Sequence, residues 1–116
     1  MTSSEARARL CRVDEIADGE SRGFFVELDG TWHNLFAVRR GDSVFAYVNS
    51  CPHTGAPLNF LPDRFLDIDG TRVLCTNHGA LFNIDDGHCI HGPCAGKDLQ
   101  SVPVSVENGE VFVGGP

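Results

Sequence analysis

Tight-turn dipeptides punctuate this chain at short intervals and restrict it to a fold of short strands. Asp29-Gly30, Asp69-Gly70, Asp86-Gly87 and Asn108-Gly109 each separate two runs rich in β-branched or aromatic residues, as two-residue hairpin loops do. Nowhere do apolar residues recur at helical spacing for more than about two turns. The sequence therefore predicts an all-β domain of roughly eight to ten short strands.

The expected strands lie between these turns. They cover residues 10–13, 24–28, 34–39, 43–48, 65–68, 72–74, 81–84, 88–90, 102–107 and 110–113. Arg40-Gly41-Asp42 supplies a further turn. Residues 14–22 and 91–97 are predicted to be loops, and residues 57–62 begin and end in Pro, which excludes regular structure. One helical turn has room within residues 58–66.

Composition narrows the class of protein. The 116 residues suit one domain over 1–116, and the formal net charge of −7 argues against nucleic acid and anionic lipid as partners. It favours instead a partner with a basic surface. No run of about eighteen apolar residues is present to span a bilayer, and residues 1–12 lack the apolar stretch of a signal peptide. We therefore expect a cytoplasmic protein with reduced thiols and no membrane segment.

Two short stretches each offer one thiol and one imidazole: Cys51-Pro52-His53 and Cys75-Thr76-Asn77-His78. A single catalytic Cys-His pair would not explain why the pairing occurs twice, and five Cys is an odd number for a disulfide framework. Structural zinc and an iron–sulfur cluster of mixed ligation both use two Cys and two His. Zinc fingers place both Cys in one pair, whereas a cluster with one iron on two thiolates and the other on two imidazoles needs one of each per loop.

The extended loops Cys51-Pro52-His53-Thr54-Gly55 and Cys75-Thr76-Asn77-His78-Gly79 resemble the cluster loops of Rieske [2Fe–2S] proteins, and small Rieske ferredoxins in particular. The resemblance implies an antiparallel β-sandwich with a cluster-binding subdomain at about 49–96. It implies one [2Fe–2S] cluster, with Cys51 and Cys75 on the inner iron and His53 and His78 on the outer iron. Residues 91–94, which include Pro93, resemble the family's loop that covers the cluster.

One departure from the family pattern is the length of chain between the two loops. His53 and Cys75 are separated by 21 residues, a few more than is common in Rieske proteins. We assign the additional residues to a hairpin over 65–74, which returns the chain to where it left and leaves the ligand set intact.

Residues around the predicted cluster favour a low reduction potential. High-potential Rieske proteins resemble one another in a disulfide between the two loops and in Ser and Tyr hydroxyls that donate to the cluster sulfurs. The matching positions here hold Ala56 and Asn77, then Ala80 and Phe82. Without those donors the reduced, more negative cluster is less stabilised, so we predict a potential near the low end of the roughly −150 to +300 mV Rieske range. Backbone N–H groups from the two Gly-containing loops (Gly55, Gly79) are expected to supply the remaining contacts to the sulfurs.

The resemblance implies a one-electron carrier that is not itself an enzyme. Such a ferredoxin works as a monomer and makes transient contacts, passing electrons from an NAD(P)H-dependent flavin reductase to a terminal ring-hydroxylating oxygenase. Two alternatives stay open. One is a fixed redox subunit of a larger oxidoreductase complex, such as a nitrite-reductase-like assembly, and the other is a zinc-stabilised interaction module. The presence of all four ligands favours the cluster-bearing carrier.

The remaining Cys residues have simpler interpretations. Cys89, His91 and Cys94 resemble half of a zinc site, but no fourth ligand is evident, because His88 is expected on the opposite face of the strand from Cys89. Ordinary packing or a Cys89–Cys94 disulfide is the simpler explanation. Cys11 is expected to be a small buried side chain.

Two groups of aromatic residues have both a structural and a functional interpretation. Trp32 beside His33 suggests a docking patch, although such a pair is more often one buried and one exposed ring. Phe60, Phe65 and Leu66 are expected to form a small core under the cluster loops, or else an exposed edge that binds a partner.

Overall fold

The structure is a computed structural model that describes residues 7–28, 30–52, 55, 57–59, 63–75, 79–92 and 96–114. The described residues form ten strands and one 3₁₀ turn. In chain order these are β1 (Arg7–Arg12), η2 (Val13–Glu15), β2 (Ser21–Leu28), β3 (Thr31–Arg40), β4 (Ser43–Val48), β5 (Arg72–Cys75), β6 (Ala80–Asn83), β7 (Cys89–His91), β8 (Ser101–Val102), β9 (Val104–Glu107) and β10 (Glu110–Gly114). None of this described chain forms a helix long and apolar enough to cross a membrane.

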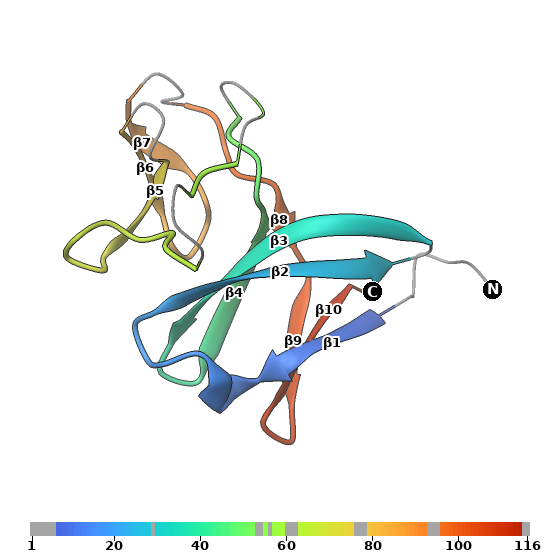
Figure 1. Ribbon diagram of the computed structural model, residues 1–116. Helices are drawn as coiled ribbons and strands as arrows, with labels where there is room; N and C mark the ends of the chain where they lie inside the picture. The colour runs from blue at the N-terminus through green and yellow to red at the C-terminus, as the bar shows by residue number, and fades with distance from the viewer. Residues whose placement is uncertain are drawn as a thin grey trace.

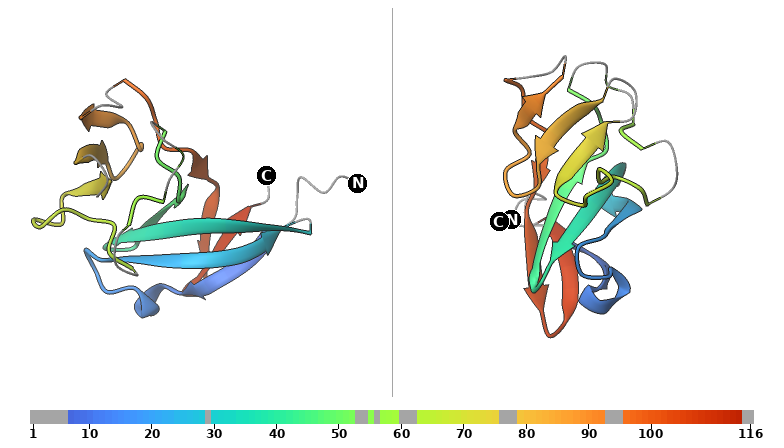
Figure 2. Two further views of the ribbon diagram at one scale, coloured as in Figure 1. Left: turned by 45° about the horizontal axis from the view of Figure 1, so that its top comes forward. Right: turned by 90° about the vertical axis from the view of Figure 1, so that its left-hand side faces the viewer.

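The strands pair into three antiparallel sheets, which confirms the predicted all-β fold (Figures 1 and 2). Sheet A has the order β1-β10-β9, sheet B the order β2-β3-β4-β8, and sheet C the order β5-β6-β7. Sheet C stands apart from the other two, at the upper left of Figure 1.

Strand β3 explains how the two parts of the molecule are joined. Its four central residues, 35–38, are all buried. Leu35 and Ala37 pack in the core between sheets A and B, whereas Phe36 and Val38 pack on the other face of sheet B, against sheet C and the segments around it. A strand buried on both faces reads as a continuous apolar run, as residues 35–38 do. Sheet B is therefore the middle layer between sheet A and the small subdomain.

The tight turns predicted at Asp29-Gly30, Arg40-Gly41-Asp42 and Asn108-Gly109 are confirmed, whereas Asp69-Gly70 and Asp86-Gly87 lie in longer loops. Leu28 pairs with Thr31 and Arg40 with Ser43, so each hairpin has a two-residue loop. At the β9–β10 turn, Asn108 and Gly109 have φ of 54° and 78°, the left-handed conformation that Asn and Gly tolerate best.

Three predictions about local structure need correction. The expected strand 102–107 is broken at Pro103, where the chain leaves sheet B as β8 and enters sheet A as β9, because proline has no N–H for a ladder. Residues 13–15 form a 3₁₀ turn in a stretch predicted as strand and loop. Residues 65–68 form no strand. The helical turn for which 58–66 has room includes residues 60–62, which lie outside the described residues.

The hairpin over 65–74 exists, but as a single bridge between Leu66 and Val73 rather than as two strands. Asp67 holds its turn, because the Asp67 carboxylate accepts from the N–H of Thr71 at 2.9 Å. Phe65 is buried and its ring stacks on Phe36 with centroids 4.5 Å apart. The prediction of a small core is therefore confirmed for Phe65, with Leu66 packed at its border, while Phe60 lies outside the described residues.

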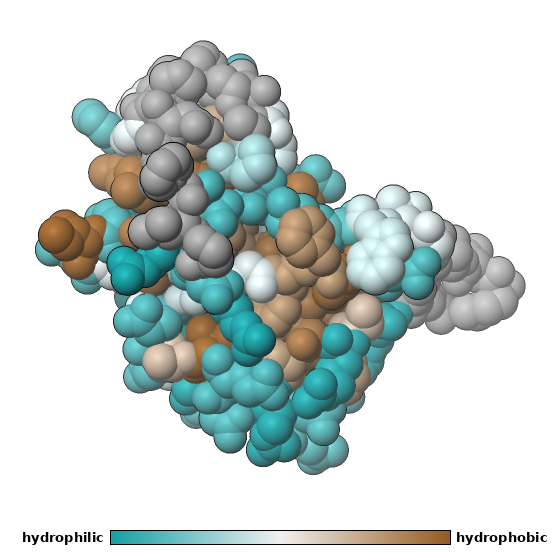
Figure 3. All heavy atoms as spheres, viewed as in Figure 1, coloured by the Kyte–Doolittle hydropathy of each residue, from teal (hydrophilic) through white to brown (hydrophobic). Residues whose placement is uncertain are grey.

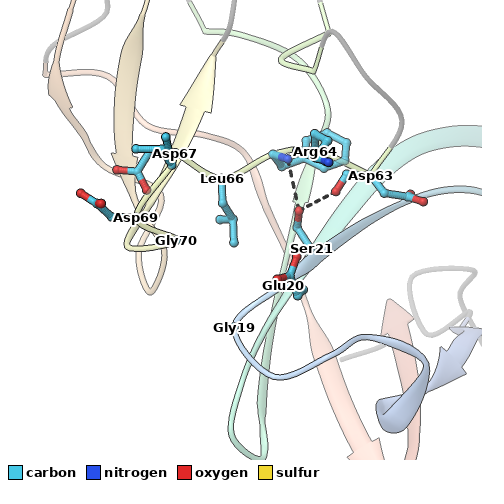
Figure 4. A pocket seen from close by; sticks show the side chains of 11 residues that line it. Gly19, Glu20, Ser21, Asp63, Arg64, Leu66, Asp67, Asp69 and Gly70 are labelled. Atoms are coloured by element: carbon cyan, nitrogen blue, oxygen red, sulfur yellow. Dashed lines mark hydrogen bonds between the residues drawn. The ribbon is translucent and has the colours of Figure 1, made fainter.

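Ser21 fastens this inserted hairpin to sheet B (Figure 4). Its hydroxyl donates to the Asp63 carbonyl at 2.9 Å and accepts from the Phe65 N–H at 3.2 Å. Between the two segments lies a cavity of about 580 Å³, lined by residues 19–21 and 63–70. The additional chain between the two loops is thus held against sheet B.

Candidate metal centre

Cys51 and Cys75 reach the same buried core from two different sheets. Cys51 follows the end of β4 in sheet B, and Cys75 is the last residue of β5 in sheet C. Both side chains are buried, and they belong to one cluster of packed residues. Two thiols supplied by separate elements to one core are the arrangement that a shared metal centre requires.

The loops that begin at these two cysteines close in the same way. The Gly55 N–H donates to the Cys51 carbonyl at 2.7 Å, and the Gly79 N–H donates to the Cys75 carbonyl at 2.9 Å. Both glycines are left-handed, with φ of 79° and 69°, and a Cβ at either would touch nothing within 4 Å. Glycine is therefore favoured here by backbone conformation rather than by space.

Each of these two N–H groups donates to the carbonyl of the cysteine in its own loop. The contact of backbone N–H groups from these loops with the cluster sulfurs stays a prediction. In this structure, Gly55 and Gly79 shape the loops that carry the thiols.

Asn49, the one buried polar side chain among the described residues, anchors the first loop. Its side-chain oxygen accepts from the Leu58 N–H at 2.8 Å, and its amide nitrogen donates to the Asn59 side-chain oxygen at 3.0 Å. Ser50 adds a weaker bond, donating to the Gly55 carbonyl at 3.2 Å. Asn49 therefore ties together the two ends of the loop that contains Cys51. The sequence analysis missed it, although an Asn at the end of a strand is a common loop signal.

Ala80 and Phe82 occupy the same face of sheet C as Cys75. Cys75 pairs with Ala80 and Val73 with Phe82, and directly opposed residues of an antiparallel ladder share a face. Both Ala80 and Phe82 are fully buried. The two positions predicted to surround the cluster are thus on the Cys75 side of the sheet, and neither carries a hydroxyl.

The third predicted loop approaches the second through Gly92. This residue has φ of 102°, and a Cβ on it would come within 2.8 Å of the Ala80 Cα. Only glycine fits so close to another backbone. Pro93 and Cys94 lie outside the described residues, so the predicted covering role and the Cys89–Cys94 disulfide stay predictions.

The base of this third loop is closed by side chains and backbone together. His88 Nδ1 lies 2.7 Å from Asp98 Oδ1, and the Cys89 N–H donates to the Lys97 carbonyl at 2.9 Å. Cys89 is buried and its thiol lies 3.3 Å from the His91 carbonyl oxygen, while the His88 side chain is exposed. The expected opposite orientation of His88 and Cys89 is confirmed.

Burial bears on two other predictions. Cys11 is buried in the core between sheets A and B, as expected of a small apolar side chain. Trp32 is 68% exposed and His33 is half-buried, so neither ring is fully inside.

The thiol pair fits a cluster of mixed ligation. His53 and His78 lie outside the described residues, and the residues that the structure does describe contain no group of three or more His, Cys, Asp or Glu side chains able to hold a metal ion. What the described part supplies is two buried thiols, each followed four residues later by a glycine whose N–H donates to the carbonyl of that cysteine. That is the half of the donor set that the inner iron of a Rieske cluster needs.

Comparison with known proteins decides the family. Residues 6–106 match the family model of the Rieske [2Fe-2S] domain. The chain belongs to this family. Its cofactor is accordingly a Rieske [2Fe–2S] cluster, and the small Rieske ferredoxin predicted from the two loops is confirmed at the level of the family and of its relatives.

Two curated relatives and one solved structure illustrate the likeness. The ferredoxin component of the p-cumate 2,3-dioxygenase system of Pseudomonas putida is 35% identical over 90% of this chain and 81% of its own. The ferredoxin component of the alkene monooxygenase system of Xanthobacter autotrophicus is 32% identical over 90% of this chain and 78% of its own. Ferredoxin components are electron-transfer proteins rather than enzymes.

The solved structure is the complex of reduced oxygenase and oxidized ferredoxin in carbazole 1,9a-dioxygenase. One of its chains is 29% identical and superposes with a TM-score of 0.73, covering 94% of this Rieske chain and 93% of that chain. The shared architecture therefore extends beyond the cluster loops to nearly the whole domain.

Proposed function

We propose that this Rieske protein carries single electrons to the terminal oxygenase of a multicomponent oxygenase system, and receives them from an NAD(P)H-dependent flavin reductase. The observation that carries the proposal is the likeness over nearly the full chain to ferredoxin components of such systems. A bound cluster supplies one-electron redox chemistry with little structural change. The chain supplies the thiols of Cys51 and Cys75 for the inner iron and the imidazoles of His53 and His78 for the outer iron.

The ligand division and the domain limits belong to this proposal. We take residues 1–116 as one Rieske domain, with the cluster-binding part at about 49–96. The separate sheet β5–β7 and the loops that begin at Cys51 and Cys75 support that division. Gly55, Gly79, Ala80, Phe82 and Pro93 are proposed to surround the cluster.

A low reduction potential is proposed from the same residues. The two buried positions next to Cys75, at Ala80 and Phe82, have no hydroxyl to donate to a sulfur. Hydrogen bonds to the sulfurs stabilise the reduced cluster, so their absence keeps the potential near the low end of the roughly −150 to +300 mV range. A film voltammogram above about +100 mV contradicts this part.

The decisive experiment is electron paramagnetic resonance of the dithionite-reduced protein, with iron and zinc analysis. A cluster with two imidazoles on one iron gives a spectrum distinct from that of an all-thiolate cluster. A colourless, iron-free protein loaded with zinc overturns the proposal.

The proposed partners require a second measurement. The reduced protein, mixed with a Rieske-type terminal oxygenase, is expected to be reoxidised at a rate that depends on ionic strength, because the chain has a formal net charge of −7. Gel filtration is expected to show a monomer, because a carrier that makes only transient contacts elutes without its partners. We place this carrier in the cytoplasm. Stable co-elution with a larger oxidoreductase favours the fixed-subunit alternative instead.

A further inference from the structure

Two aromatic side chains are exposed next to each other on the outer face of the β2–β3 hairpin. Phe25 is 73% exposed and Trp32 is 68% exposed. Phe25 pairs with Asn34 and Glu27 with Trp32, so Phe25 and Trp32 are diagonal neighbours on one face. Figure 3 shows apolar residues gathered at the centre of this face, over β2 and β3, with hydrophilic residues below them.

The same face is covered farther along the hairpin. Gly23 pairs with Phe36, whose ring is stacked on Phe65, and a Cβ on Gly23 would meet the Phe65 ring at 3.3 Å. The inserted hairpin therefore covers one end of this face, and the part at Phe25 and Trp32 is left open.

Strand β2 also presents an open backbone edge beside these aromatic residues. It is the first strand of sheet B, with β3 on one side only. The Gly23 N–H points away from β3, because it donates to the Asp63 carboxylate at 2.8 Å. Alternate residues of an antiparallel strand face the same way, so the N–H groups of Phe25 and Glu27 also point outward. No bond from either group to another described residue is found.

A groove of about 380 Å³ continues from this edge toward the first cluster loop. Its lining includes Phe25 and Asn34 from the sheet, with Pro57, Asn59 and Asp63 from the chain that follows the Cys51 loop. Asn59 accepts from Asn49, which lies two residues before Cys51. An occupant of the groove would therefore touch the residues that hold the first cluster loop.

We propose that the β2 edge and this groove bind an extended, basic segment of the redox partner, which adds as a strand beside Phe25 and Glu27. The proposal rests on the proposed function and names one surface that such a partner uses. An extended segment matches the outward N–H and C=O groups, as in β-strand addition. Apolar side chains match Phe25 and Trp32. Basic side chains match exposed Glu27 and Asp63, which is the one charged residue among the described residues that line the groove.

Charge favours a basic partner over a second copy of this chain at the edge. Each copy has a formal net charge of −7, so two copies repel each other as they approach, whereas a basic segment is attracted.

The test uses the full-length, cluster-loaded protein and two synthetic hexapeptides with threonine at every second position, so that the other side chains share one face. These other side chains are lysine and valine in one peptide and glutamate and valine in the other. The lysine peptide is expected to slow hydrogen exchange of the amides in residues 24–28, and salt is expected to weaken its binding. The glutamate peptide is expected to bind at least about tenfold more weakly, a difference of about 1.4 kcal/mol.

Four variants separate the edge from the rest of the surface. Glu27→Pro removes one outward N–H without breaking a bond to β3, and Phe25→Ser removes one aromatic ring; each is expected to weaken the lysine peptide about tenfold. Glu27→Gln keeps the N–H and is expected to cost no more than about threefold. Ile68→Ser removes a side chain that is fully exposed elsewhere, and is expected to change nothing.

The same peptide is then added to the electron-transfer assay with the oxygenase. It is expected to slow transfer from the unsubstituted protein and from Ile68→Ser, but not from Phe25→Ser. Equal peptide binding by all four variants overturns the proposal, as does dimerisation that only Phe25→Ser removes. Because peptide binding is measured without electron transfer, its failure is distinguishable from an absence of the cluster.

Discussion

The hydroxyl of Tyr47 donates to the backbone carbonyl of Ile84 at 2.6 Å. Tyr47 belongs to β4 in sheet B, whereas Ile84 follows β6 in sheet C, so this buried bond joins the two parts of the molecule. Replacing Tyr47 by Phe keeps the ring and leaves the carbonyl unsatisfied. We expect a loss of about 1–3 kcal/mol in the free energy of unfolding, measured by urea denaturation. A loss below about 0.3 kcal/mol would show that water replaces the hydroxyl.

The raised pKa of Tyr47 predicts that the folded protein loses stability at alkaline pH. Burial, with smaller contributions from Asp86 and Asp85, raises the pKa of Tyr47 from 10.0 to about 12. The folded state therefore holds this proton more tightly than the unfolded state, and its stability falls as the pH rises from 10.0 to about 12. Tyr47→Phe is expected to lack this part of the loss. Because the chain has one Tyr, the titration is visible directly in the tyrosinate absorbance.

Gly92 and Gly96 form a matched pair for testing how the third loop is seated. Both have left-handed φ, of 102° and 90°, but only a Cβ at Gly92 meets another backbone, 2.8 Å from the Ala80 Cα. Gly96→Ala is expected to cost about 1–2 kcal/mol from conformation alone. Gly92→Ala is expected to cost more and to alter the visible circular dichroism of the cluster. Identical spectra for the two variants would contradict the role of the Gly92–Ala80 contact.

Asn49 is predicted to matter for loading of iron as well as for stability. Asn49→Ala removes the acceptor of the Leu58 N–H, and we expect a loss of about 1–3 kcal/mol together with a lower ratio of iron to protein. Ser50→Ala is the control, because it removes a longer and exposed bond to the Gly55 carbonyl. Equal iron content in the two variants would count against Asn49 as the anchor of this loop.

Removal of either thiol ligand is predicted to abolish the cluster. Cys51→Ala and Cys75→Ala are expected to give colourless protein without an iron signal, because an iron left with one thiolate is not retained. Cys11→Ala is the control: burial raises the pKa of its thiol, with a smaller effect of Glu15, so this thiol stays protonated in a different core. Full loading of Cys75→Ala would refute the assigned ligands.

The last prediction concerns the reduction potential. Phe82→Tyr places a hydroxyl on the buried face that carries Cys75. If that hydroxyl donates to a sulfur, it stabilises the reduced cluster and raises the potential by roughly tens of millivolts, measured by film voltammetry. Leu81→Ile, on the opposite face of β6, is expected to leave the potential unchanged. A lower potential in Phe82→Tyr would contradict the assignment.

Local chemistry made much of this fold predictable from sequence. The β9–β10 turn was recognisable because Asn-Gly favours the left-handed backbone that the structure contains at Asn108 and Gly109. The change of sheet at Pro103 could not be predicted. The sequence around a proline between two apolar runs is the same whether the flanking strands join one sheet or two. Long-range pairing decided that outcome.

The two thiol ligands of the candidate site were predictable from sequence, whereas the residues that position their loops were less so. Cys51 and Cys75 were identified by their spacing from histidine, a property of the sequence alone. The roles of Tyr47 and Gly92 depend on partners distant in the chain, at Ile84 and Ala80, so no local pattern pointed to them. Asn49 carries a local loop signal, but its bond to Asn59 could not be predicted from it.

Cys51 follows sheet B and Cys75 ends a strand of sheet C, so a metal centre held by both would cross-link two sheets that are hydrogen-bonded independently of each other. Because the metal centre binds only the folded state, its binding free energy adds to the stability of the contact between sheets B and C. In a cell short of iron, newly made chains would lack this cross-link, and their small subdomain would unfold more often and be exposed to proteases. The abundance of this protein would then follow the iron supply without any change in its synthesis.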